Sequence, residues 1–173
     1  FYKDAFHSFI YKRNNPSLGA VNNWNSLLDK AQGDYCLLLH HDEFPLSANF
    51  IGKVTDTLSV NTAIDVLIMD CVLVDINTGF SRQHAPSWFR NLSAKYFPEY
   101  LFRRNIIGPV STLIVRRSVF PRFNEKLQWL VDVELYVRLF TQGITIKTAA
   151  NIQIGSAPDK NHSITASLGN EVF

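Results

Sequence analysis

Apolar and polar residues follow one another along this 173-residue chain in blocks that predict strands and helices in turn. Runs of apolar and β-branched residues predict strands over 6–12, 35–40, 63–74, 111–116 and 144–154. Apolar residues at helical spacing predict helices over 21–31, 47–59 and 131–142, with Ser17 as the first N-cap and Gly33 and Gly143 at C-terminal ends. Because strands and helices alternate at the start of the chain, the pattern predicts an α/β fold with a mostly parallel sheet flanked by helices.

Residues 81–104 mix aromatic residues with charges, and they predict two short helices. Their aromatic side chains are interpreted either as part of the core or as a wall of an acceptor site. The residues from 155 to 173 are rich in Gly, Ser and Asn and predict a loosely ordered tail. The length predicts a single domain over residues 1–173.

Composition narrows the class of protein. The chain is 46% hydrophobic and 18% charged, which is typical of a globular domain, and no apolar run is long enough to cross a bilayer. Its net charge of +2 gives no electrostatic reason to expect a nucleic-acid partner. Cys36 and Cys71 both lie in apolar runs, which predicts buried thiols in a reducing compartment and hence a cytoplasmic protein.

The most concentrated chemistry lies between Tyr35 and Glu43. An apolar run predicted as a buried strand leads directly into His40, His41, Asp42 and Glu43. If the strand continued, period-2 alternation would place His40 and Asp42 on one side and His41 and Glu43 on the other. Two interpretations stay open here: a metal site at the carboxyl end of a strand, or a solvated strand end.

Asp132 is a second candidate, at the predicted start of the last helix. The helix macrodipole would stabilise its carboxylate there, so that Asp132 could accept a proton as a general base. The alternative is that Asp132 only stabilises the helix end. Glu134 and Arg138 are interpreted as an ordinary ion pair one helical turn apart.

Four motifs occur together in an order that resembles the family-2 glycosyltransferases of the GT-A fold. They are N-x-x-x-L-G-x-x-x-N-W-N over 14–25, A-Q-G-D-Y-C-L-L-L-H-H-D-E over 31–43, N-I-I-G-P-V-S over 105–111 and W-L-V-D-V-E-L-Y-V-R-L over 129–139. The resemblance implies that His40-His41-Asp42 takes the place of the family's Asp-x-Asp motif, with Asp42 as a metal ligand and His40 in place of the first Asp. It also implies that Asp132 is the catalytic base, while Val131 replaces the family's Glu.

The resemblance implies an inverting transfer from a nucleotide-sugar donor to a saccharide or lipid-linked acceptor, with Mn²⁺ or Mg²⁺ as the cofactor. His162 resembles a late histidine that completes the metal site in some enzymes of this fold. The resemblance further implies two groups of binding residues: Arg13, Asn22, Asn25, His41 and Glu43 for the nucleotide, and Asn105, Gly108, Ser111 and Trp129 for the donor sugar or acceptor.

The family's first nucleotide-binding strands have no counterpart before Phe6, which predicts a partial GT-A-like sheet with an unpaired edge and therefore self-association. The setting implied by the family is polysaccharide assembly, in the cytoplasm or at the inner face of the membrane. Two other functions stay open. One is a degenerate domain that acts as a binding or assembly module, and the other is a metal-dependent hydrolase built on His40, His41 and Asp42.

Overall fold

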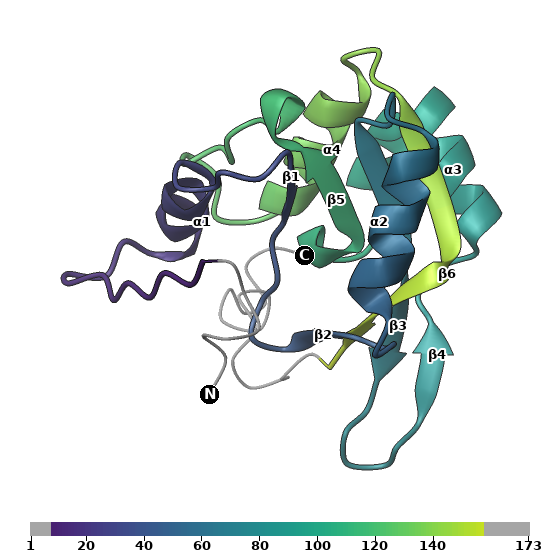
Figure 1. The fold of residues 1–173 in the computed structure, drawn as a ribbon, viewed down its shortest axis with the longest axis horizontal. Coiled ribbons are helices and arrows are strands. Elements are labelled where there is room, and N and C mark those ends of the chain that lie inside the picture. Colours follow the sequence, from purple (N-terminus) through teal and green to yellow (C-terminus); the bar gives the residue numbers. More distant parts are fainter. Residues whose placement is uncertain (1–7, 158–173) are drawn as a thin grey trace.

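The computed structural model describes residues 8–157 and shows a mixed α/β fold (Figure 1). These residues form helices α1 (Ala20–Leu28), α2 (Phe50–Val60), α3 (Ser87–Tyr96) and α4 (Val131–Phe140). The strands are β1 (Tyr35–Leu37), β2 (Glu43–Pro45), β3 (Val66–Val74), β4 (Ser81–Gln83), β5 (Leu113–Arg116) and β6 (Ile146–Ser156). Short 3-10 helices are η2 (Pro98–Phe102), η3 (Val110–Thr112) and η4 (Arg117–Val119).

The six strands form one sheet in the order β1-β5-β3-β6-β2, and β4 pairs with the end of β3. Within the described residues, β3 and β6 form the one parallel pair, and the other four pairings are antiparallel. The prediction of a mostly parallel sheet is therefore wrong, although the α/β class is confirmed. The apolar pattern identifies which segments are strands, but it holds no information on the direction in which β5 enters between β1 and β3.

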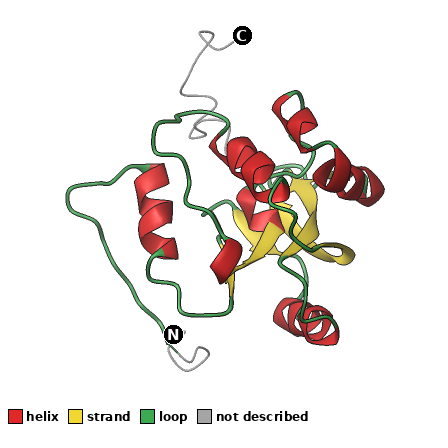
Figure 2. Ribbon diagram, turned by 90° about the horizontal axis from the view of Figure 1, so that it is seen from above, coloured by secondary structure: helices red, strands yellow, loops and turns green. Residues whose placement is uncertain are grey.

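Helices cover both faces of the sheet (Figure 2). Along β3, Val66 and Ile68 face a core shared with α3 and α4, whereas Leu67 and Met69 face a second core shared with α2. This alternation follows from the period of two in a strand. Because both faces are covered, β3 is almost continuously apolar, as expected for a central strand.

Several predicted boundaries are wrong. Residues 8–12 form no strand and are exposed, because the segment has no pairing partner among the described residues. The first helix begins after Gly19 and not after a Ser17 cap, and Gly33 lies beyond its end at Asp29. Strand β6 continues through residues 155 and 156, which were predicted to belong to a loose tail.

The segment 81–104 agrees with its prediction in part. It contains the helix α3 and the 3-10 helix η2, but its first three residues form β4, a short polar strand that the apolar pattern does not indicate. Across residues 8–157, no helix combines the length and the apolar character that a membrane crossing requires.

Candidate metal and acid–base site

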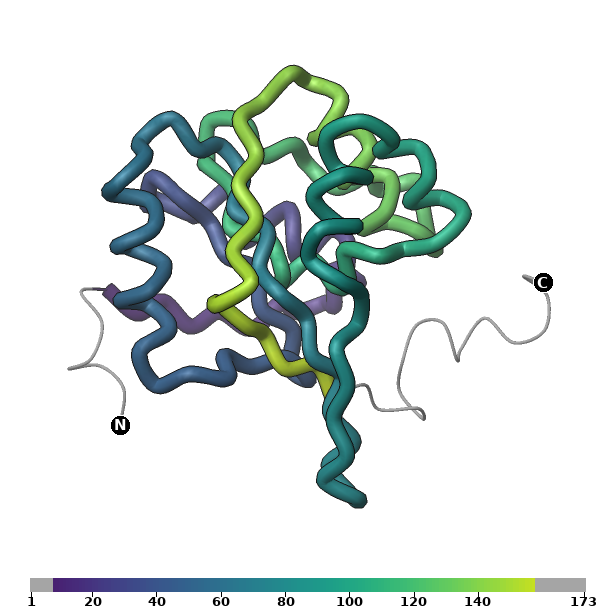
Figure 3. The backbone as a smooth tube through the Cα atoms, turned by 90° about the vertical axis from the view of Figure 1, so that its right-hand side faces the viewer, coloured from purple at the N-terminus to yellow at the C-terminus, as the bar shows by residue number. Residues whose placement is uncertain are grey.

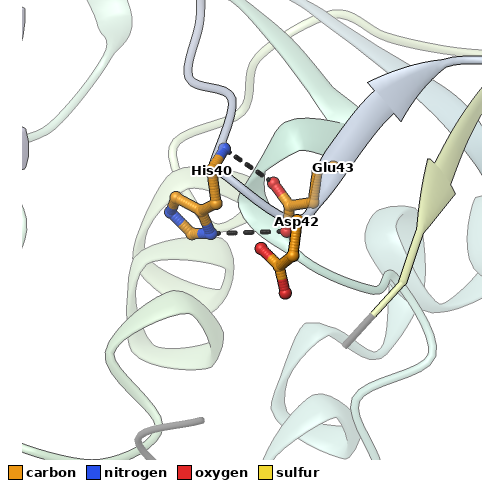
Figure 4. Close-up of side chains that lie close together, drawn as sticks. All are labelled: His40, Asp42 and Glu43. Carbon is orange, nitrogen blue, oxygen red and sulfur yellow. Dashed lines mark hydrogen bonds and ion pairs between the residues drawn. The ribbon is translucent and has the colours of Figure 1, made fainter. Parts of the chain in front are cut away.

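The turn that follows β1 brings three possible metal ligands together (Figure 4). The amide of Glu43 donates a hydrogen bond to the carbonyl of His40 at 3.3 Å, so the chain reverses between these residues. The ligand atoms of His40, Asp42 and Glu43 lie within 4.8 Å of one another. The predicted alternation, which separates Glu43 from His40 and Asp42, is wrong because the strand ends at Leu37 and a turn replaces it.

Glu43 holds His40 through two contacts. Its Oε1 lies 3.3 Å from His40 Nδ1, and its Oε2 accepts a hydrogen bond from the His40 backbone amide at 3.0 Å. Burial alone would raise the pKa of Glu43, but these contacts with His40 outweigh burial and lower the pKa. Burial likewise opposes protonation of His40, but Glu43, Asp42 and Asp132 together raise the pKa of the imidazole.

The His40 ring is also fixed by stacking. It lies against the Trp24 ring with centroids 5.0 Å apart and an interplanar angle of 23°, and Trp24 in turn contacts Phe123. Its second nitrogen, Nε2, is buried and has no hydrogen-bond partner within residues 8–157. A histidine held by a carboxylate at one nitrogen and unpartnered at the other can accept a proton or a hydrogen bond there.

Asp132 lies in the first turn of α4 with its carboxylate held by two donors. The Asn105 side chain donates to Oδ2 at 3.0 Å, and the backbone amide of Val133 donates to Oδ1 at 2.9 Å. Burial raises the pKa of Asp132 more than these hydrogen bonds and the nearby His40 lower it. The sequence predicts that the start of the helix stabilises the ionised carboxylate, but burial has the larger effect on the pKa of Asp132. A raised pKa makes the carboxylate a stronger base.

The loop before η3 positions Asn105. The Asn105 Oδ1 accepts the amides of Ile107 and Gly108, both at 3.1 Å, and its Nδ2 also donates to the Gly108 carbonyl at 3.0 Å. The buried hydroxyl of Tyr136 donates to the same carbonyl at 3.0 Å. Asn105 and Gly108 therefore build the support that holds Asp132.

A pocket of about 320 Å³ lies beside His40 and Asp132. Its lining includes polar groups of His40, Asn105 and Asp132 and the aromatic rings of Trp24, Phe123 and Trp129. The Trp129 side chain is partly exposed at the pocket rim, directly before the residue Leu130, which adopts a left-handed conformation with φ 54° at the start of α4. The pocket therefore brings together a candidate base, a histidine nitrogen without a hydrogen-bond partner and apolar ring faces.

The other predicted site residues lie outside this pocket. Arg13, Asn22 and His41 are exposed, and the Asn22 amide donates to the Leu18 carbonyl at 3.2 Å. Ser111 is fully buried, and its side chain contributes to the lowered pKa of Glu43. His162 lies outside the described residues.

Asn25 has a structural role that differs from the predicted nucleotide contact. It is buried on α1, where its amide exchanges hydrogen bonds with the backbone of Phe123 and donates to Glu125. These bonds attach α1 to the loop before α4 and occupy the amide fully. Asn25 is therefore not free to contact a nucleotide in this structure.

The donor set of the cluster fits a divalent cation. Two carboxylates and one imidazole match the ligand preferences of Mn²⁺, and the carboxylates also suit Mg²⁺. The lowered pKa of Glu43 favours the ionised form of its carboxylate. The sequence-based prediction assigns Glu43 to the nucleotide and separates it from His40 and Asp42, because the turn that joins them is not predicted. It also misses Trp24 as the stacking partner of His40, which is a tertiary contact.

In comparisons with known proteins, the chain matches no protein-family model and no curated protein sequence.

Proposed function

We propose that this chain acts as a metal-dependent glycosyltransferase domain that moves a sugar from a nucleotide-sugar donor to a hydroxyl group of a saccharide or lipid-linked acceptor. One observation carries the proposal. A cluster of cation ligands, His40, Asp42 and Glu43, adjoins a pocket that also contains a separately held carboxylate, Asp132. Glycosyl transfer needs both functions within one substrate length: charge stabilisation at the leaving group and a base at the acceptor.

Asp132 supplies the base in this proposal. Its carboxylate accepts the proton of the acceptor hydroxyl as that oxygen attacks the anomeric carbon and the bond to the nucleotide diphosphate breaks. Burial raises its pKa, so the group binds a proton more readily than a solvated aspartate. Asn105 and the Val133 amide fix the orientation of the carboxylate, which lines the pocket.

His40, Asp42 and Glu43 would hold Mn²⁺ or Mg²⁺, which when bound supplies positive charge that stabilises the leaving diphosphate. The chain prepares this site in advance, because the turn at 40–43 and the stack on Trp24 fix the His40 ring. The aromatic rings of Trp24 and Trp129 provide apolar surfaces for the face of a sugar.

The two other functions are distinguishable. A binding or assembly module would bind the donor without turnover, and the structure offers no observation that favours it over an enzyme. A hydrolase built on His40, His41 and Asp42 loses support, because His41 is exposed and does not belong to the cluster.

The first test is calorimetric titration of UDP-, GDP- and dTDP-sugars in the presence of Mn²⁺. We expect one donor class to bind the wild-type chain and to lose affinity in Asp42→Ala and Glu43→Gln. Asp56→Ala, which removes an exposed carboxylate on α2, is the matched control and should bind as the wild type does. Donor turnover that persists in Asp132→Asn would show that Asp132 is not the base. If none of the donors binds the wild-type chain, the proposed function is contradicted.

A further inference from the structure

Helix α3 buries two polar residues together with Ala94 and leaves three large apolar residues exposed. Arg90 is fully buried and Ser93 nearly so, whereas Trp88, Leu92 and Tyr96 are 69%, 39% and 67% exposed. The three exposed residues follow one another at intervals of four, so they form one stripe along the helix. A surface helix normally shows the reverse arrangement, with its apolar stripe facing the core.

A buried ion pair fixes this orientation. Arg90 pairs with Asp70, which lies buried on β3, and the Ser87 hydroxyl donates to the same carboxylate at 2.9 Å. Gln83 completes the group with a hydrogen bond of 2.7 Å to Asp70. An unpaired charge in the core costs several kcal/mol. Rotating α3 to bury its apolar stripe would separate Arg90 from Asp70, so the stripe stays outside.

The exposed stripe continues onto η2. Phe97, Tyr100 and Phe102 are 59%, 37% and 50% exposed. Ring contacts connect the two elements, since Phe89 lies 5.4 Å from Trp88 and 5.8 Å from Tyr100 between ring centroids. The aromatic face consists of the exposed side chains of Trp88, Leu92, Tyr96, Phe97, Tyr100 and Phe102. Helix α3, which carries the first three, lies at the right of Figure 1, and the same part of the chain lies at the right of Figure 3.

Positive charge borders this aromatic face. Lys95, Arg103 and Arg104 are exposed, and none of them takes part in an ion pair within residues 8–157. Glu99 is the one acidic residue between positions 87 and 104. A contiguous exposed apolar patch marks an interaction surface, and its cationic border favours a partner that is negatively charged.

We propose that the aromatic face docks on an anionic lipid surface. Trp and Tyr side chains favour the headgroup region of a bilayer, and Lys and Arg beside them are attracted by anionic lipids. A second copy of the chain fits less well, because two cationic borders would face each other and repel. The docking does not depend on the proposed transferase activity. It would place the loop after Arg104, which supports Asp132, near the headgroups.

Co-sedimentation with vesicles tests the docking. We expect the full chain to sediment with phosphatidylcholine vesicles that contain phosphatidylglycerol, and to stay in the supernatant with phosphatidylcholine alone. In Lys95→Gln/Arg103→Gln/Arg104→Gln, the partition coefficient should fall roughly a hundred-fold, at about five-fold for each lost charge. In Trp88→Ser/Tyr96→Ser it should fall at least about ten-fold, because these side chains no longer enter the interface.

Ile51→Ser/Val60→Ser is the matched control, since it removes two exposed apolar side chains from α2 on the other face of the sheet. It should sediment as the wild type does, and circular dichroism should show that all variants are folded. Three results would overturn the proposal. They are equal sedimentation with both kinds of vesicle, wild-type sedimentation of both the charge variant and Trp88→Ser/Tyr96→Ser, and self-association that disappears in Trp88→Ser/Tyr96→Ser.

Discussion

His40 and Glu43 change each other's protonation, and this coupling gives the molecule a pH-dependent stability. The pKa of His40 is raised, so its contribution is fully present below its ordinary value of 6.5 and is lost as the pH rises through the folded-state pKa. The pKa of Glu43 is lowered, so its contribution is present above its ordinary value of 4.5 and is lost as the pH falls through the folded-state pKa. The pair therefore stabilises the fold most between these two limits.

We predict that Glu43→Gln lowers the free energy of unfolding by roughly 1 kcal/mol near pH 6, a modest value because the His40 ring is partly exposed to solvent. The difference from the wild type should shrink at higher and lower pH. Urea denaturation of metal-free protein across a pH series measures it. A difference that stays constant over the series would show that the pair does not titrate as a unit.

Gly108 is a second residue whose role follows from local geometry. Its φ is 102°, a conformation that strains any other residue, and an added Cβ would lie 3.2 Å from Cys71 Cβ. We predict that Gly108→Ala destabilises the chain by about 2–3 kcal/mol and also reduces activity, because Gly108 supports Asn105 and hence Asp132. Gly79→Ala is the control: φ is 72° there, but no atom lies within 4 Å. Thermal unfolding should therefore show a smaller loss for Gly79→Ala.

The sequence predicts part of the candidate site at this scale. Asp42 is a candidate because ligands bind at the carboxyl ends of strands, and Asp132 is one because a helix start stabilises a carboxylate. Glu43 was assigned to the wrong side, since alternation assumes a strand where the chain turns. The stack of Trp24 on His40 joins residues from two separate elements, and no local pattern indicates such a contact.

At the scale of the element, α3 shows why an apolar pattern alone does not orient a helix. The sequence predicts two short helices within residues 81–104, and α3 and η2 lie in this segment. Taken alone, the spacing of Trp88, Leu92 and Tyr96 would place these three residues in the core. The structure buries the opposite side, because Asp70 on the neighbouring strand needs a charged partner. Local sequence does not reveal that Asp70 and Arg90 meet.

We predict that Arg90→Met destabilises the chain by about 3–5 kcal/mol, because Asp70 would remain buried without its charged partner. The double variant Asp70→Leu/Arg90→Met should recover much of this loss, since no buried charge is left. Arg122→Ala is the matched control: it breaks an ion pair with Asp29 in which both side chains are more than half exposed, so the loss of stability should be much smaller. If urea denaturation gave equal losses for Arg90→Met and Arg122→Ala, the buried pair would not fix α3.

At the scale of the whole molecule, the sequence predicts most of the elements but not the way in which the sheet is assembled. Helices α1, α2 and α4 and strands β1, β3, β5 and β6 all overlap predicted segments. Strands β2 and β4 have three residues each and carry little apolar signal, so they are absent from the prediction. Strand direction depends on long-range pairing, which is why one parallel pair appears in place of a mostly parallel sheet.

The assembled sheet also supports a prediction about self-association. Within residues 8–157, β1 lies at one end of the sheet and pairs with β5 alone, so its other edge has no partner there. An unpaired edge favours pairing with a second chain, and charged side chains at an edge oppose it. We predict concentration-dependent elution in size-exclusion chromatography, and a shift toward the monomer in Leu39→Lys, which places a charge at an exposed position just after β1.

The aromatic-face variant Trp88→Ser/Tyr96→Ser separates the two surfaces. Edge pairing through β1 does not involve α3, so this variant should elute as the wild type does at every concentration. A monomer peak for the wild-type chain at high concentration would contradict edge pairing. If association persists unchanged in Leu39→Lys, a surface other than the β1 edge forms the contact. Leu39 directly precedes His40. If Leu39→Lys kept the cation affinity of the wild type, the β1 edge and the candidate ligands His40, Asp42 and Glu43 would act independently.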